Sequence, residues 1–364
     1  MAEDTKEPQQ QLQIRASRLF VPWLSDLGAS LAFTTYQAGK LFLIGINPEG
    51  KLSVFERTFQ RSMGLGVAKG RPGTFYMSAL YQLWRFENFL DPGEMHEGYD
   101  AVYVPIAGHT TGDIDIHDIH ANGSERPIFV ATRFNCLARV SQEVSFEPVW
   151  KPPFIDRIAA EDRCHLNGMA MPETEGEVGG LPAYVTCVSK TNVADGWREN
   201  RLGGGIVVDV ASGEVIASGL SMPHSPRLHD GKLWILQSGT GEFGSVDLKT
   251  GLFQPVCFLP GFARGVSFAG NHAIIGLSRP RSEASFTGLP VNERLKLEGI
   301  SPKCGLVVVN LKTGDLEHSF EIDGVVEELY DVAILPGIRR PMALGFKTNE
   351  IRFMIRPGPL ADEE

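Results

Sequence analysis

The chain has 364 residues, of which 43% are hydrophobic and 21% charged, so it can build a large core and extended disorder is excluded. Its 34 basic and 44 acidic residues give a net charge of -10, which excludes a general nucleic-acid binder, whose footprint would be basic. The 40 glycines and 23 prolines predict many turns and short elements.

The composition of the two chain ends indicates where the domain begins and ends, and the cysteines indicate its cellular compartment. Residues 1–14 are polar and predict a disordered leader, and residues 358–364 predict an acidic tail, around one domain at 15–357. No signal peptide and no apolar run of about 18 residues is present, so no membrane contact is expected. The five scattered cysteines predict a reducing, cytoplasmic setting: Cys136, Cys164, Cys187, Cys257 and Cys304.

In chain order, the predicted elements are short β-strands separated by Gly, Asn, Asp and Pro, with almost no helix. The strands are predicted at 31–37, 40–46, 51–59, 74–80, 127–134, 183–189, 204–210, 232–238, 305–311, 342–346 and 351–355. Two segments between strands, 189–205 and 278–304, are long enough to suggest lids, and NERLKLEG in the second could form a short helix.

Internal repeats indicate which all-β architecture the chain adopts. One hairpin recurs at 206–215, 244–253 and 306–316, each with Asp or Asn before a Ser/Thr-Gly turn whose glycine supplies a positive φ. A second feature, a strand that follows a small or polar residue, recurs about every 50 residues, which suits one propeller blade. We count six such inner strands and seven second strands; the N-terminal TTYQAGKLF has no obvious inner strand before it, and LGFKTNEIRF is the last of the seven. The sequence therefore predicts a β-propeller, with seven blades slightly favoured over six, closed by N- and C-terminal strands.

Histidines recur at equivalent positions in three successive repeat units. His117 lies in DIDIHDIHANG, His165 in RCHLNGMA and His224 in MPHSPRLHDG. Neutral imidazoles that converge on a propeller axis predict a divalent metal site, with iron or copper favoured and zinc or manganese as alternatives. His120 and His229 are weaker candidates that could replace one of these ligands, because the first faces the opposite side of its strand and the second precedes a turn.

Other polar side chains are predicted at the same end of the propeller. Tyr330 and Asp331 are candidates for moving a proton. Arginines there predict an anionic group or peptide as substrate, although exposed loops are commonly polar anyway. The predicted substrate-binding residues are Arg264, Arg133, Trp197, Arg198, Tyr36, Gln37, Lys40 and Asn167.

The stretches SLAFTTYQAGKLF, CHLNGMA and MPHSPR resemble a bacterial family of uncharacterised propeller-type proteins, whose members occur alone or beside tetratricopeptide repeats. The resemblance covers roughly residues 20–357. It implies the propeller fold and no particular reaction.

Two classes of function therefore remain open. The first is a metal-dependent enzyme, either an oxidoreductase with iron or copper, with an oxygenase as one form of it, or a lyase or hydrolase with manganese or zinc. The second is a non-catalytic propeller that binds a peptide or a partner protein and whose histidines are structural.

Overall fold

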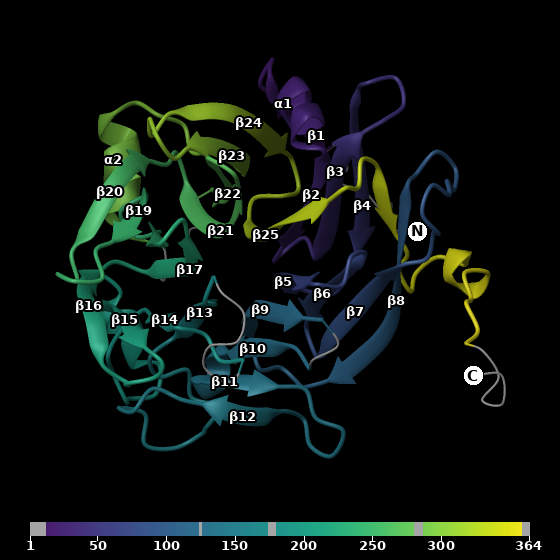
Figure 1. Ribbon diagram of the computed structural model, residues 1–364. Helices are drawn as coiled ribbons and strands as arrows, with labels where there is room; N and C mark the ends of the chain where they lie inside the picture. The colour runs from purple at the N-terminus through teal and green to yellow at the C-terminus, as the bar shows by residue number, and fades with distance from the viewer. Residues whose placement is uncertain (1–11, 124–125, 174–179, 280–286, 359–364) are drawn as a thin grey trace, which may run out of the picture.

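A computed structural model describes residues 12–123, 126–173, 180–279 and 287–358. In this part of the chain nearly all regular structure is β, arranged as sheets around a central axis that is seen end-on in Figure 1. The inner strands lie next to the axis and the fourth strands lie at the periphery. The all-β, propeller-like fold predicted from the sequence is confirmed.

Three sheets contain four antiparallel strands each. The first consists of β25 (Leu329–Pro336), β2 (Ala29–Thr35), β3 (Lys40–Ile46) and β4 (Leu52–Thr58). The second consists of β13 (Leu166–Ala170), β14 (Tyr184–Cys187), β15 (Gly205–Asp209) and β16 (Val215–Leu220). The third consists of β17 (Pro223–His229), β18 (Lys232–Gln237), β19 (Glu242–Val246) and β20 (Phe253–Phe258).

Two larger sheets contain the same four-stranded unit. The five-stranded sheet consists of β21 (Phe262–Ala269), β22 (His272–Ser278), β23 (Gly305–Asn310), β24 (Leu316–Asp323) and the edge strand β1 (Gln13–Ala16). The nine-stranded sheet holds two units. One consists of β5 (Ser62–Lys69), β6 (Thr74–Ala79), β7 (Gln82–Asn88) and β8 (Ala101–Thr110), with β26 (Pro341–Ala343) at its edge. The other consists of β9 (Ile116–Asn122), β10 (Ile128–Ala131), β11 (Cys136–Arg139) and β12 (Glu147–Trp150).

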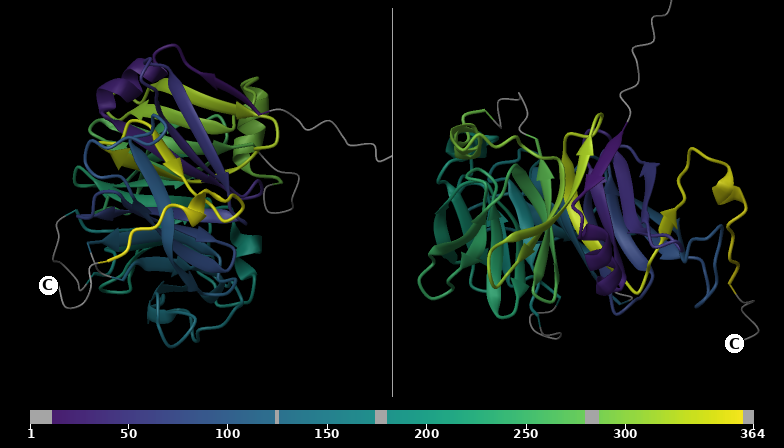
Figure 2. Two further views of the ribbon diagram at one scale, coloured as in Figure 1. Left: turned by 90° about the vertical axis from the view of Figure 1, so that its right-hand side faces the viewer. Right: turned by 90° about the horizontal axis from the view of Figure 1, so that it is seen from above.

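The described strands therefore form six antiparallel meanders of four strands, and the favoured count of seven is wrong. The segment LGFKTNEIRF was counted as the second strand after the last inner strand, but β2 takes that place beside β25, and β26, just before the segment, pairs in parallel with the outer strand β8. The predicted strand at 351–355 is also wrong, because the 3₁₀-helix η3 (Glu350–Arg352) stands there. Figure 2 shows this C-terminal segment running along the outside of the β5–β8 meander. The predicted closure by terminal strands is confirmed, since β2 pairs antiparallel with β25.

The recurring hairpin turns form as the sequence predicts. Gly213, Gly251 and Gly314 have φ of 74°, 71° and 79°. In each turn the preceding Asp or Asn carboxyl or amide oxygen accepts a main-chain N–H, as Asp209 does from Ser212 at 2.8 Å. These local hydrogen bonds explain why the repeat was readable without the structure.

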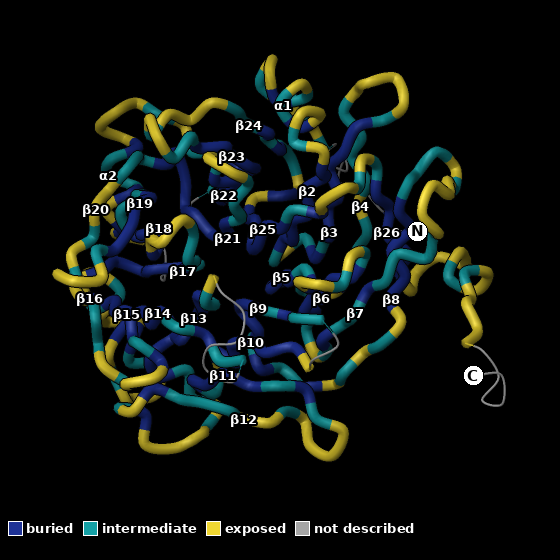
Figure 3. Tube along the Cα trace, in the orientation of Figure 1, coloured by how far each residue is buried: buried dark blue, intermediate teal, exposed yellow. Residues whose placement is uncertain are grey.

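Two short helices occur where the sequence suggested almost none. α1 (Phe20–Leu27) buries Phe20 and Leu24, and Phe20 packs against Phe320 on β24 at 5.9 Å between ring centroids. α2 (Pro290–Leu297) overlaps the predicted NERLKLEG helix and starts on a proline, which is favoured at the first helical position. Figure 3 shows burial concentrated on the inner and second strands, with exposed residues at the turns outside them.

The predicted terminal segments lie mostly outside the described residues. β1 begins at Gln13, two residues inside the predicted leader, and residues 1–11 and 359–364 are not described. All five cysteines are described and are free thiols. Neither helix in the described ranges is long and apolar enough to cross a membrane.

Inner strands of neighbouring meanders are joined near the axis by polar side chains. Two carboxylates make such contacts: Asp331 accepts from the N–H of Leu65 at 2.9 Å, and Asp118 accepts from the N–H of Met169 at 3.0 Å. Asp118 also forms a two-pronged ion pair with Arg227, at 2.7 and 3.0 Å. Because both carboxylates are buried, these contacts are made in a low-dielectric environment, where they are strong.

Smaller groups complete the ring of inner strands. Three more hydrogen bonds join consecutive inner strands: Asn167 Nδ2 to Pro223 O at 2.9 Å, Gly265 N to Ser225 Oγ at 3.0 Å, and Ser267 Oγ to Val332 O at 2.8 Å. The remaining pair, β5 and β9, is joined by parallel strand pairing. That approach requires Gly66, because an added Cβ would lie 2.5 Å from the carbonyl oxygen of Ile119.

Hydroxyl groups at or just after the ends of the second strands form a further set of contacts, which we call the hydroxyl ring. Its members are Thr34, Ser78, Thr132, Thr186, Ser238 and Ser278. Five donate directly to a carbonyl at or next to the start of the next inner strand, for example Thr132 to Leu166 O and Ser238 to Ala263 O, both at 2.6 Å. Thr186 acts through Asn167, whose amide donates to Pro223 O. Five of the six hydroxyl protons thus join two meanders directly, and that of Thr186 orients the Asn167 side chain that does so.

We predict that Asp118→Ala lowers the free energy of unfolding by about 3 kcal/mol, because the guanidinium of Arg227 and the N–H groups of Met169 and Ile119 lose their acceptor. Urea denaturation measures the change. As a matched control, Glu147→Ala removes an exposed carboxylate of the edge strand β12, which pairs with Arg126. This substitution should change stability by less than about 1 kcal/mol. Equal destabilisation by both substitutions would show that the axial contacts are not important for stability.

Candidate functional site

A cavity of about 110 Å³ opens at one end of the central channel, where the inner strands begin. Residues at or next to the starts of the six inner strands line it, together with the loops after β2 and β14. The lining residues are Tyr36, Met63, Asp115, His117, His165, Trp197, Met222, Arg264, Glu328 and Tyr330. The predicted convergence of inner-strand starts and second-to-third-strand loops is therefore present in the structure.

His117, the second residue of β9, is held by its Nδ1 atom. Nδ1 lies 3.0 Å from the carbonyl oxygen of Asp115 and 2.8 Å from Thr132 Oγ1. The Thr132 hydroxyl gives its proton to Leu166 O, so toward His117 it can only accept. Nδ1 therefore carries the hydrogen, and Nε2 is an acceptor when the ring is neutral. Burial, aided by His165 and Arg264 and opposed by Asp115, lowers the pKa of His117 to about 4.

His224, on β17, is held in the same way. Its Nδ1 lies 2.8 Å from the carbonyl oxygen of Met222 and 3.1 Å from Ser238 Oγ, whose proton is donated to Ala263 O. Burial and the nearby Arg264 lower the pKa of His224 well below its usual value. Its Nε2 is buried and has no hydrogen-bond partner among the described residues. His224 thus presents a second acceptor nitrogen to the channel.

His165 has a different partner, a carboxylate. Its Nδ1 lies 2.9 and 3.0 Å from the two oxygens of Asp162, and Asp162 also accepts from Trp197 Nε1 at 2.8 Å. Burial tends to raise the pKa of Asp162, but the interactions with His165 and Trp197 outweigh it and the pKa is lowered. Trp197 stacks on the imidazole with ring centroids 4.2 Å apart. The ring is therefore fixed with Nε2 as its available basic nitrogen.

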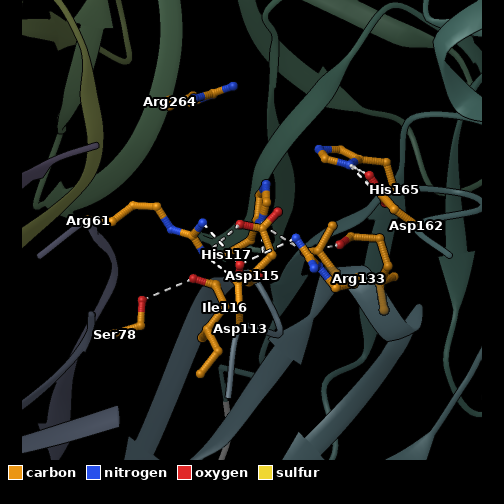
Figure 4. Close-up of polar contacts among 12 residues, drawn as sticks. Arg61, Ser78, Asp113, Asp115, Ile116, His117, Arg133, Asp162, His165 and Arg264 are labelled. Atoms are coloured by element: carbon orange, nitrogen blue, oxygen red, sulfur yellow. Dashed lines mark hydrogen bonds and ion pairs between the residues drawn. The ribbon is translucent and has the colours of Figure 1, made fainter. Parts of the chain in front are cut away.

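The three histidines lie around one space. The rings of His117 and His165 are 4.9 Å apart and nearly perpendicular, and Figure 4 shows both pointing into the same gap that Arg264 faces from the other side. A narrow extension of about 10 Å³ below the cavity is lined by His117, His224 and Tyr330 among others. Within the described ranges, no three His, Cys, Asp or Glu side chains are placed so that they could hold a metal ion. The predicted metal trio thus lines one channel without forming a preassembled site.

Tyr330 and Arg264 complete the lining of the cavity. The Tyr330 ring is 5.3 Å from His117, and its buried hydroxyl has no hydrogen-bond partner in the described part of the chain. Burial and the nearby Asp115 raise the pKa of Tyr330 well above its usual value, so the phenol stays protonated. Arg264 pairs with Glu328 at 2.6 Å and its guanidinium lies 5.2 Å from the Tyr330 ring centre.

Several predicted substrate-binding residues lie away from the cavity. Lys40 pairs with Glu56 across β3 and β4 at 2.7 Å, and Gln37 is exposed in the turn that follows Tyr36. Arg133 is exposed and lies 3.4 Å from Asp113, while Arg198 is exposed over the indole of Trp197. Of this set, the structure brings Tyr36, Trp197 and Arg264 to the cavity.

Asn167 and Asp331 line the narrow extension but are used by the fold. Both join neighbouring inner strands, and Asn167 additionally accepts from Thr186 at 2.8 Å. Burial and the nearby Asp118 raise the pKa of Asp331 to about 7, opposed by Arg227 and two N–H donors. The structure therefore gives these two residues a role in closing the ring.

His120 and His229 do not replace a member of the trio. His120 lines a larger cavity of about 700 Å³ at the opposite end of the channel, as expected for the other face of its strand. His229 Nε2 lies 2.9 Å from the carbonyl oxygen of Gly270, and its ring stacks on Phe268.

Sequence reasoning missed Asp162 as the partner of His165, as well as the cavity residues Met63, Met222 and Glu328. The spacing Asp-x-x-His at 162–165 was a usable signal, but it required both residues to leave an extended conformation. Their φ angles are 38° and 49°, and Asp115 and Met222 near the same cavity are also positive, at 61° and 48°. Such conformations in residues other than glycine gather at functional sites, where the surrounding structure imposes them.

The chain belongs to a family of uncharacterised proteins, the domain of unknown function DUF4915, which matches residues 18–344. This agrees with the resemblance seen in the sequence. A search of curated protein sequences finds no match.

Solved structures similar to this chain share little sequence with it. A chain of a nidogen/laminin complex is 10% identical with a TM-score of 0.53, over 85% of this chain and 99% of that one. Weaker likenesses include a protein of unknown function from Bacteroides caccae (11% identity, TM-score 0.45, 84% and 98% coverage) and virginiamycin B lyase from Staphylococcus aureus (11%, 0.39, 86% and 100%). At these identities the likeness concerns the fold alone.

The lowered pKa of His117 predicts that stability falls in mild acid. The unfolded chain binds a proton near pH 6.5 and the folded protein only near pH 4, so this contribution is complete above about pH 6.5 and is lost as the pH falls toward 4. His117→Gln should reduce the slope of unfolding free energy against pH by up to about 1.4 kcal/mol per pH unit. Denaturant titrations at pH 7, 6 and 5 measure this slope. The control His96→Gln, in the loop between β7 and β8, should keep the wild-type slope, and an unchanged slope in His117→Gln would contradict the assignment.

Proposed function

We propose that this protein is an enzyme that moves protons on a small molecule at the mouth of its central channel. The observation that carries the proposal is the Asp162–His165 pair, with the carboxylate on Nδ1 and Nε2 available at the cavity. A buried carboxylate in this position fixes the tautomer of the imidazole and stabilises the imidazolium that forms when Nε2 takes a proton. His165 is therefore the proposed general base.

Tyr330 is the proposed general acid. Its protonated hydroxyl lines the same cavity, and its ring and that of His165 both lie about 5 Å from the ring of His117. Arg264, beside Tyr330, supplies a positive charge that can stabilise a developing negative charge on the substrate or on the phenolate. A base and an acid on two sides of a small cavity suit a reaction in which one proton leaves and another is delivered.

Elimination is the reaction that these groups support together. In it, His165 Nε2 takes a proton from a carbon next to a carbonyl group, and the carbon–hydrogen electron pair becomes a carbon–carbon double bond. The bond to the departing oxygen breaks, and the Tyr330 hydroxyl gives its proton to that oxygen. Solvent then takes the proton from His165 and returns one to Tyr330. The cavity of about 110 Å³ limits the substrate to a small molecule or to the end of a longer one.

The test is turnover of a library of small carbonyl compounds by wild-type protein and by two variants. His165→Gln and Tyr330→Phe should each lower kcat by about 10²- to 10⁴-fold, because each removes one proton-transfer group. The control His229→Gln, at the other end of the channel, should keep wild-type turnover. Turnover that survives in His165→Gln would contradict the proposal, and binding without any turnover would favour the non-catalytic propeller.

Metal-dependent chemistry at His117, His165 and His224 stays a prediction, and one observation favours it. Each of the three rings uses Nδ1 for a carbonyl or carboxylate oxygen, as histidines that bind metals commonly do, which directs Nε2 elsewhere. Iron or copper, and less so zinc or manganese, would then supply Lewis-acid or redox chemistry. The oxidoreductase and oxygenase assignments depend on a bound metal. The anionic or peptide substrate and the cytoplasmic location likewise stay predictions.

Elemental analysis of purified protein separates the two mechanisms. The proton-transfer proposal predicts less than about one tenth of a metal equivalent per chain after dialysis, and unchanged turnover in a chelator. One equivalent of iron or copper that is lost in a His165→Gln, His224→Leu double variant would support the metal-dependent enzyme instead. A loss of turnover in chelator that is restored by one metal would point the same way.

A further inference from the structure

The hydrogen-bonding character of the cavity indicates the kind of ligand it takes. His117 and His224 each give the Nδ1 hydrogen to a main-chain carbonyl oxygen, so each can only accept at Nε2 while neutral. His165 gives its Nδ1 hydrogen to Asp162, so its Nε2 likewise offers an acceptor in the neutral ring. Three imidazole rings thus offer acceptor lone pairs to one channel. The Nε2 atom of His224 has no hydrogen-bond donor within the described residues.

A buried acceptor without a donor is unfavourable, so a ligand that brings a donor gains free energy on binding. Hydroxyl and amino groups provide such hydrogens. A carboxylate or phosphate has only acceptor oxygens, and these would face the imidazole lone pairs without a hydrogen between them.

The charges of the lining residues agree with this preference. Arg264 carries the positive charge of the cavity lining, and it is paired with Glu328 at 2.6 Å. Asp115 adds a second carboxylate, 3.9 Å from Arg61 behind it. One cation against two carboxylates gives an anion no net attraction. The exposed arginines expected to attract one, Arg133 and Arg198, lie outside the lining.

We propose that the ligand of this cavity is a small, uncharged, hydroxyl-rich molecule, a polyol or a sugar, whose hydroxyl hydrogens are accepted by Nε2 of His117, His165 and His224. A sugar, whose open-chain form has a carbonyl group, is then the substrate class of the proposed enzyme, and a polyol is its unreactive analogue; this assignment rests on the proposed function. The binding itself needs no turnover. Hydroxyl groups on adjacent carbons match acceptors spread around a channel better than a single point cation does, which agrees with the lack of a preassembled metal trio in the described residues.

The experiment compares pairs of probes that differ at one end, where a hydroxymethyl group of the polyol is replaced by a carboxylate. Erythritol is matched with erythronate, and glucitol with gluconate, by isothermal titration calorimetry against the full chain at pH 7.5. Each polyol should bind the wild-type protein at least tenfold more tightly than its carboxylate partner. Tighter binding of either carboxylate, or no measurable binding of both polyols at concentrations up to 50-fold above those of the protein, overturns the proposal.

Variants locate the binding and separate it from catalysis. His117→Leu and His224→Leu each remove one acceptor and should weaken polyol binding at least fivefold, while His229→Gln should bind like wild type. If the leucine variants do not fold, the wild-type comparison of matched probes still decides. Polyol binding together with no turnover of any compound in the carbonyl library supports the ligand class and overturns the proton-transfer function, whereas turnover with preferred carboxylate binding does the reverse. Equal binding by wild type and both leucine variants overturns the assigned acceptors.

Discussion

The hydroxyl ring is the constraint on which the rest of the structure depends. Five of its six hydroxyls donate a proton from one meander to the next, as Thr132 does to Leu166 O and Ser238 does to Ala263 O. The same two hydroxyl oxygens are then available only as acceptors, and each contacts the Nδ1 atom of a histidine. The contacts that hold the meanders together therefore also decide which nitrogen of each imidazole carries the hydrogen.

This arrangement produces two kinds of histidine from one structural position. His117 and His224 are backed by neutral carbonyl oxygens and are deeply buried, so proton uptake leaves an unpaired charge, and the pKa of each is lowered. His165 is backed by the carboxylate of Asp162, which can balance the charge of an imidazolium. The difference in partner assigns hydrogen-bond acceptance to the first two rings and proton abstraction to the third.

Local patterns in the sequence were enough for the fold class and for the histidines. Alternating strands and Asp/Asn-x-x-Ser/Thr-Gly turns are set by neighbouring residues, and the repeat spacing placed His117, His165 and His224 on one channel. Features that depend on tertiary contacts could not be predicted from the sequence. β26 was counted as part of a new meander because its parallel pairing with β8 joins residues about 240 positions apart. Lys40 follows Tyr36 closely in sequence, yet strand alternation directs it to Glu56. Asp162 required a left-handed backbone that no pattern indicated.

The most direct test of this account is the tautomer of the imidazoles, which ¹⁵N NMR of protein labelled at histidine reports for each ring nitrogen. At pH 7, His117 and His224 should both show a protonated Nδ1 and an unprotonated Nε2, and Thr132→Val or Ser238→Ala should disturb the signal of only the histidine that its hydroxyl contacts. A protonated Nε2 on either ring, or a doubly protonated ring, would contradict the account, because the channel would then offer donors where we assign acceptors.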